Sequence, residues 1–189
     1  MSGKSLGTGI RCPVFVKRRA GPLLVLVLLL VLAAMMIPVH VLEVRTVREN
    51  RVLMVRRVVP GDTFSLGFIH SVEKSPVRDF YGVDAWWRLV QRETEFSSCN
   101  TGLPVTLQGR EKLINDGARF RVTGMERVLP EILLWVHETS GNMLVFKDGS
   151  ALKLARPGDS PKLLRVAVMP ITAGQFIIET ITAGDNTPS

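Results

Sequence analysis

An uncharged apolar stretch near the N-terminus constrains this chain more than any other feature. From Ala20 through Val39 no residue carries a formal charge, and the next acidic residue is Glu43. A helix that crosses ~30 Å of hydrocarbon needs roughly 20 apolar residues, whereas a soluble helix of that length would show a polar face. The stretch therefore predicts one N-terminal transmembrane helix within residues 20–42.

The basic cluster Lys17-Arg18-Arg19 stands directly before this stretch. Such clusters stay on the cytoplasmic side of a membrane, so we expect residues 1–19 to be cytoplasmic and the rest of the chain to be exported. A cleaved signal peptide is the alternative, because Val31-Leu32-Ala33 resembles a cleavage site. A retained anchor is favoured because apolar residues continue to Leu42.

The net charge of +7 is concentrated in the same N-terminal part. Residues 1–42 contain five of the 24 Lys and Arg and no acid, which leaves 19 basic against 17 acidic residues, or +2, in the remainder. Without a basic domain, nucleic acid is not an expected partner. Cys12 precedes the apolar stretch and Cys99 follows it, so no disulfide within the chain is expected.

Beyond residue 42 the apolar residues alternate with period two, and turn residues recur. This pattern predicts an all-β domain over residues 43–182, an antiparallel β-sandwich or a partly open barrel, followed by a polar tail over 183–189. One hairpin is expected between residues 87–96 and the segment around Phe80, and a second between 132–137 and 143–146. The other expected strands are 52–55, 64–70, 119–122, 151–154, 163–169 and 176–181.

The first candidate site is the polar segment that follows the apolar strand ending at His70. Neighbouring residues of a strand point to opposite faces, so His70 and Ser71 would diverge and do not form a hydrolase dyad. Glu93 and Glu95 share one face of their strand, from which a carboxylate could approach His70. We therefore weigh three roles for this segment: a turn held by His70, a binding surface, and catalysis.

The second candidate site is the run of small polar residues from Phe96 to Pro104, which predicts a loop. Such a loop can present backbone N–H groups to an anion, although many loops only connect strands. No H-x-x-x-H, C-x-x-C, H-E-x-x-H or G-x-S-x-G pattern occurs in the sequence. We therefore expect no metal, no cofactor and no catalytic residue.

At these two segments the sequence resembles the DUF1850 family, over roughly residues 42–170. The likeness rests on the order and spacing of a few short motifs. The family usually has a Gly-Ala-Gly-Leu-Pro loop, of which this sequence keeps only the end, Gly102-Leu103-Pro104. The matching motifs are Gly61-Asp62, Phe68-Ile69-His70-Ser71-Val72-Glu73, Pro76-Val77, Tyr81, Glu95-Phe96-Ser97 and Gly102-Leu103-Pro104.

The resemblance implies a small bacterial protein anchored in the inner membrane, with its domain in the periplasm. Such proteins are commonly encoded beside tripartite ATP-independent periplasmic (TRAP) transporters of the TAXI type, so the implied partners are the permease or the TAXI solute-binding protein. The expected function is that of a non-enzymatic accessory or binding protein. Its candidate binding residues are His70, Ser71, Glu73, Pro76, Gly102, Leu103 and Pro104.

Two other functions stay open at this point. One is an envelope hydrolase that uses His70 with a carboxylate of Glu73, Glu93 or Glu95, and the other is a purely structural envelope protein. A pocket that gathers His70 and a carboxylate would favour the hydrolase or a ligand binder, whereas a flat exposed patch would favour a partner interface.

Overall fold

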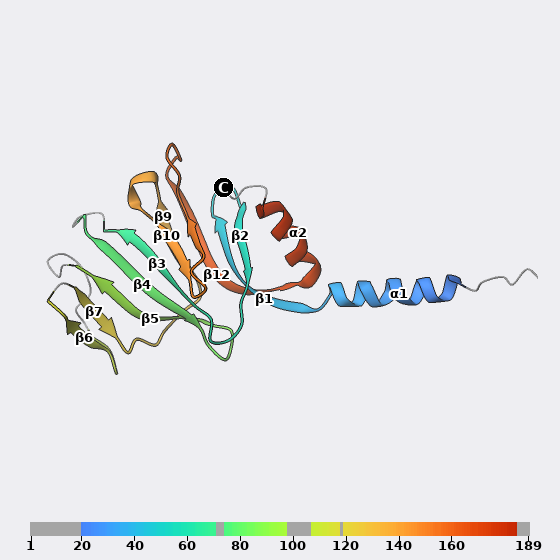
Figure 1. Cartoon of the computed structure of the whole chain (residues 1–189), viewed down its shortest axis with the longest axis horizontal. Helices are drawn as coiled ribbons and strands as arrows, with labels where there is room; N and C mark the ends of the chain where they lie inside the picture. Colours follow the sequence, from blue (N-terminus) through green and yellow to red (C-terminus); the bar gives the residue numbers. More distant parts are fainter. Residues whose placement is uncertain (1–19, 71–73, 98–106, 118, 185–189) are drawn as a thin grey trace, which may run out of the picture. The chain divides into compact units, whose positions relative to one another are not determined.

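A computed structural model describes residues 20–70, 74–97, 107–117 and 119–184 of the chain (Figure 1). The chain divides into two units, residues 1–34 and residues 35–189.

The first unit contributes most of helix α1, Ala20–Met35. The run of leucines and valines favours a helix without any polar side, and the large apolar residues from Leu23 to Leu32 are between 50% and 72% exposed. Within the described residues, no helix reaches the length and hydropathy that a membrane crossing requires.

The apolar stretch differs from the expected span at its C-terminal end. Residues 20–42 do not form one helix, because β1 begins at Pro38 and the helix has already ended at Met35. Val41 and Leu42 are completely buried in the second unit. Leu42 packs in the core between the two sheets, and Val41 is buried on the opposite face of β1. The β domain therefore starts before the predicted boundary at residue 43.

The second unit contains two antiparallel sheets. The four-stranded sheet has the order β2-β1-β12-β9, and its strands are β1 Pro38–Thr46, β2 Val52–Arg57, β9 Ile132–Val136 and β12 Lys162–Thr172. The eight-stranded sheet has the order β11-β10-β3-β4-β5-β7-β6, with β8 paired to β5. Its strands are β3 Thr63–Ile69, β4 Pro76–Val83, β5 Leu89–Phe96, β6 Lys112–Asn115, β7 Phe120–Thr123, β8 Arg127–Leu129, β10 Met143–Phe146 and β11 Ala151–Lys153.

The two sheets face each other across one apolar core. Alternation along each strand supplies the side chains, since every second residue points inward. From the four-stranded sheet these are Leu42, Val44, Ile132, Val136, Leu164 and Val166, and from the larger sheet Phe64, Leu66, Tyr81, Val83, Leu89 and Leu144. A second cluster of Val77, Phe96, Val122 and Met125 fills the inner side of β4, β5 and β7.

Most of the predicted strands are confirmed, with two exceptions. The hairpin expected between 132–137 and 143–146 is wrong: the 3-10 turn Glu138–Ser140 connects β9 to β10, but the two strands belong to different sheets. The strand expected at 176–181 is also wrong, because these residues lie in α2, Ala173–Gly184.

Helix α2 packs on the outer side of the four-stranded sheet, against β2, β12 and β1 (Figure 1). Under it lies Glu43, whose side chain is 1% exposed. Burial opposes ionisation of this carboxyl, but hydrogen bonds and charge from Arg45 and Arg165 outweigh it and hold the pKa of Glu43 below its usual value. The distances are 2.6 Å from Arg45 Nη2 to Glu43 Oε2 and 3.1 Å from Arg165 Nη2 to Glu43 Oε1.

Candidate functional site

The two candidate segments of the sequence follow strands of the larger sheet whose ends lie on the same side of that sheet. β3 ends at Ile69, which pairs with Pro76 at the start of β4. The next residue of β4, Val77, pairs with Phe96, the last residue of β5. Because β3, β4 and β5 are consecutive neighbours in the sheet, segments that lie far apart in the chain begin side by side.

The structure describes two of the predicted binding residues, His70 and Pro76. The backbone of His70 closes a turn: its N–H donates to the carbonyl of Ser75 at 2.9 Å, and its carbonyl accepts from the N–H of Lys74 at 2.9 Å. Lys74 has a φ of 53°, in the left-handed region that turns often require. The other predicted residues, Ser71, Glu73, Gly102, Leu103 and Pro104, lie outside the described residues.

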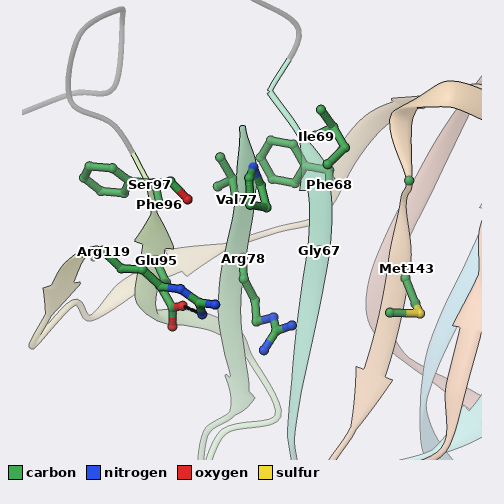
Figure 2. A pocket seen from close by; sticks show the side chains of 12 residues that line it. Gly67, Phe68, Ile69, Val77, Arg78, Glu95, Phe96, Ser97, Arg119 and Met143 are labelled. Atoms are coloured by element: carbon green, nitrogen blue, oxygen red, sulfur yellow. Dashed lines mark hydrogen bonds and ion pairs between the residues drawn. The ribbon is translucent and has the colours of Figure 1, made fainter. Parts of the chain in front are cut away.

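At these strand ends the surface forms a cavity of about 210 Å³, which we call the strand-end depression (Figure 2). Pro76 belongs to its lining, and His70 is the residue directly after its Ile69. One part of the lining is apolar and consists of Phe68, Ile69, Pro76, Val77, Phe96 and Met143. The charged part consists of Arg78, Glu95 and Arg119.

The carboxylate of Glu95 is held by two arginines of the neighbouring strand region. Arg119 donates from Nη1 to Glu95 Oε1, and Arg121 Nη2 lies 3.5 Å from Glu95 Oε2. Arg121 also contacts Glu93, with 3.1 Å between Nε and Oε1. The hydrogen bond and charge of Glu95 raise the pKa of Arg119 further above its ordinary value. The prediction that Glu93 and Glu95 share a face is thereby confirmed.

Arg78 differs from these two arginines. It stands opposite Glu95 on one side and opposite Gly67 on the other. Figure 2 shows its guanidinium turned towards β3, while Glu95 is turned towards Arg119. Within the part of the chain that the structure describes, Arg78 has no ion-pair partner.

A shallower hollow continues along the same outer face of the sheet and shares Arg78 and Glu95 with the strand-end depression. Its lining adds the apolar side chains of Phe80 and Val145 and the cation of Lys147. The lining of the two hollows together contains five cations and two carboxylates, so the face is positive. The cations are Arg78, Arg92, Arg119, Arg121 and Lys147, and the carboxylates are Glu93 and Glu95.

The inner face of β4 carries a separate polar group, the carboxyl of Asp79. Thr94 Oγ1 donates to it at 2.6 Å and the Tyr81 hydroxyl at 3.3 Å. Burial raises the pKa of Asp79, and burial together with the nearby Asp79 raises the pKa of Tyr81. Asp79 does not line either hollow, so this group belongs to the core and not to the depression.

Sequence reasoning missed the arginines of this face. The signal was present in the alternation, because Arg78, Glu93, Glu95 and Arg121 all occupy outward positions of predicted strands. It did not reveal which of them would pair, since only β4 and β5 were expected to be neighbours and β7 had no assigned partner strand. Among the described residues, no three His, Cys, Asp or Glu side chains gather closely enough to hold a metal ion.

Comparison with known proteins yields one result. No curated protein and no solved structure matches the chain significantly. The sequence model of a family described as "Domain of unknown function (DUF1850)" matches residues 64–154. This range runs from the second residue of β3 to the residue after β11, is narrower than the expected 42–170, and contains the whole strand-end depression. Residues 64–154 therefore match the DUF1850 family, which confirms the resemblance for this segment of the chain.

Proposed function

We propose that this protein is a non-enzymatic accessory protein of a TAXI-type TRAP transporter. An N-terminal segment anchors it in the bacterial inner membrane, and its β domain faces the periplasm. The strand-end depression is its contact site for the permease or the TAXI solute-binding protein. One observation carries the proposal. Both motif segments adjoin neighbouring strand ends, and their flanking residues Ile69, Pro76 and Phe96 line a single depression.

The apolar surface of α1 supports the membrane anchor. Ten consecutive large aliphatic residues, from Leu23 to Leu32, are each at least 50% exposed, and water is a poor solvent for such a surface. The 16 residues of α1 rise ~24 Å, and the exposed apolar residues Met36 and Ile37 follow directly, against ~30 Å of hydrocarbon. The preceding Lys17-Arg18-Arg19 cluster favours a cytoplasmic N-terminus.

The charges of the depression favour binding over hydrolysis. A general base needs a carboxylate that is available to take a proton, and Glu95 is held by Arg119 and Arg121. An apolar wall beside fixed charges is typical of a surface that recognises a partner or a ligand. The transporter partner itself comes from the family resemblance.

Copurification from the native membrane tests the proposed partner. Full-length tagged protein, extracted in mild detergent, should bring down the permease or the TAXI solute-binding protein. Ile69→Glu should abolish this association, because Ile69 lines the depression and is 38% exposed. Val128→Glu is the matched control: Val128 is an exposed strand residue of the same sheet, outside both hollows, and its change should leave the association intact. Equal recovery of partner with both variants would refute the site.

Reporter fusions test the proposed topology. Alkaline phosphatase, which is active outside the cytoplasm, and β-galactosidase, which is active inside it, are each fused after Gly184, the last residue of α2. We expect phosphatase activity only. β-Galactosidase activity at this position would contradict the periplasmic location.

A further inference from the structure

Gly67 lies in the interior of β3, where the backbone conformation does not require a glycine. It is not among the glycines of positive φ, and a Cβ at this position would meet only the carbonyl oxygen of Met143, at 3.9 Å. An alanine side chain would therefore fit at this position. Glycine in a strand interior makes the folded protein less stable than alanine does. A strand glycine of this kind often marks a place where another molecule approaches the backbone closely.

The space above Gly67 adjoins the one arginine of the depression that lacks an ion-pair partner among the described residues. Arg78 and Gly67 are directly paired across β3 and β4, both line the strand-end depression, and Figure 2 shows the guanidinium turned towards β3. Arg119, the other arginine of the lining, is occupied by Glu95. A guanidinium donates two parallel N–H groups, the geometry that a planar carboxylate accepts.

The rest of the lining decides which anion fits. Phe68, Ile69 and Met143 are apolar, so they favour a ligand with an apolar body beside its charge. Glu95 lies in the same lining and would repel a second negative charge. A strongly hydrated phosphate dianion would need more donors than the single unpaired Arg78 supplies.

We propose that the strand-end depression binds the carboxylate of a ligand with an apolar body. Arg78 donates both N–H groups to the carboxylate, and the missing side chain of Gly67 leaves room for the ligand over β3. The carboxylate belongs to a free organic acid or to the C-terminus of a partner protein. This inference rests on the proposed function, because it names the chemistry that the same depression recognises.

Direct binding to the purified full-length protein in lipid nanodiscs tests the proposal. The probes are benzoate and hexanoate, with benzamide as the uncharged control, and ligand-observed NMR titration measures their affinity. We expect saturable binding of at least one acid and none of benzamide. Arg78→Gln should weaken binding tenfold or more, because it removes a charge-assisted pair of hydrogen bonds. Arg51→Gln, which removes an exposed cation outside the depression, should not change it.

Two variants of Gly67 separate function from folding. Gly67→Ala should raise the melting temperature or leave it unchanged, since its Cβ meets no atom closer than 3.9 Å, and it should weaken acid binding several-fold. Gly67→Val should abolish binding. Failure of both acids to bind the wild-type protein, equal binding by Arg78→Gln, or full binding by Gly67→Val would each overturn the proposal.

Comparing the free acids with N-acetyl-alanyl-leucine identifies the source of the carboxylate. Tighter binding of benzoate or hexanoate supports a free organic acid, and tighter binding of the peptide supports a protein C-terminus. The titrations need no transporter, so they are independent of copurification. If the partner copurifies in an Ile69-dependent manner but no acid binds, the carboxylate inference fails and the proposed function stands. If an acid binds but no transporter protein copurifies, the ligand site stands and the proposed transporter partner fails.

Discussion

At the scale of single residues, β4 departs from the usual alternation of polar and apolar side chains. Phe80 shares the outer face with Arg78, whereas Asp79 points inward with Val77 and Tyr81. The Asp79 carboxyl accepts hydrogen bonds from Thr94, Tyr81 and Gln91, which are all neutral groups. A buried carboxyl with only neutral partners favours its protonated form, so its pKa is raised.

This raised pKa makes Asp79 a source of pH-dependent stability. A carboxyl whose pKa is higher in the folded than in the unfolded chain stabilises the fold below its unfolded value and loses this contribution as the pH rises through the folded value. Asp79→Asn keeps an acceptor for Thr94 and needs no charge. We expect the variant to melt a few degrees higher than the wild type at pH 7, with the difference shrinking towards pH 4. Thermal melts between pH 4 and 8 check this, and a variant that is less stable at pH 7 would contradict it.

At the scale of elements, the centre of β1 depends on one buried ion cluster. Glu43 accepts from Arg45 on its own strand and from Arg165 on β12, and α2 covers it from outside. Glu179 of α2 lies 3.7 Å from Arg45 and close enough to Glu43 that burial and this like charge raise the pKa of Glu179. The cluster therefore connects two strands and the covering helix through charge.

Removing the central carboxylate should be costly. Glu43→Gln leaves the charges of Arg45 and Arg165 without their buried partner, and breaking such a pair costs roughly 3 kcal/mol. For a domain of this size the melting temperature should fall by about 6–12 °C. Glu126→Gln is the control, because its carboxylate is 71% exposed and 4.0 Å from Arg92, and its change should stay within ~0.5 kcal/mol.

The same cluster gives a second pH signature of opposite sign. The pKa of Glu43 is lowered in the folded protein, so its contribution is present above the unfolded pKa and is lost as the pH falls through the folded value. The stability difference between the wild type and Glu43→Gln should therefore shrink on acidification. A difference that stays constant from pH 7 to pH 3 would show that Glu43 acts through packing alone.

At the scale of the whole molecule, the β domain begins inside the apolar stretch that also contains α1. Residues 38–42 pair with residues 168–172 of β12, and Val41 and Leu42 pair with Arg57 and Arg56 of β2. A boundary at residue 43 would remove half of a central strand and the fully buried Leu42. The apolar stretch thus belongs to two structural units.

A pair of truncations tests this boundary. Residues 36–189 should be strand-rich by circular dichroism and melt cooperatively. Residues 43–189 should lose most of their stability, because removing the side chain of one buried leucine costs ~2–5 kcal/mol and domains have only about 5–15 kcal/mol in all. Equal melting temperatures would contradict the assignment of residues 38–42 to the sheet.

Some features of the fold follow from neighbouring residues alone, and these could be predicted. Period-two alternation predicted β3, β5, β10 and β12, and the spacing of two runs predicted the β4–β5 hairpin. The strand predicted at residues 176–181 was wrong because the prediction used only local residues. A short run of Phe, Ile and Thr suits a strand, but packing of α2 against β2 favours the helix.

The sequence by itself determined the apolar segment, the antiparallel β class and the two motif segments, because each depends on side chains within a few positions of one another. Only the tertiary structure decided that β9 pairs with β12 and β10 with β3, that Glu95 pairs with Arg119, and that Gly67 lies opposite Arg78. Pairing between strands is a long-range choice, set by which apolar faces bury each other best, and it carries no mark in the local pattern.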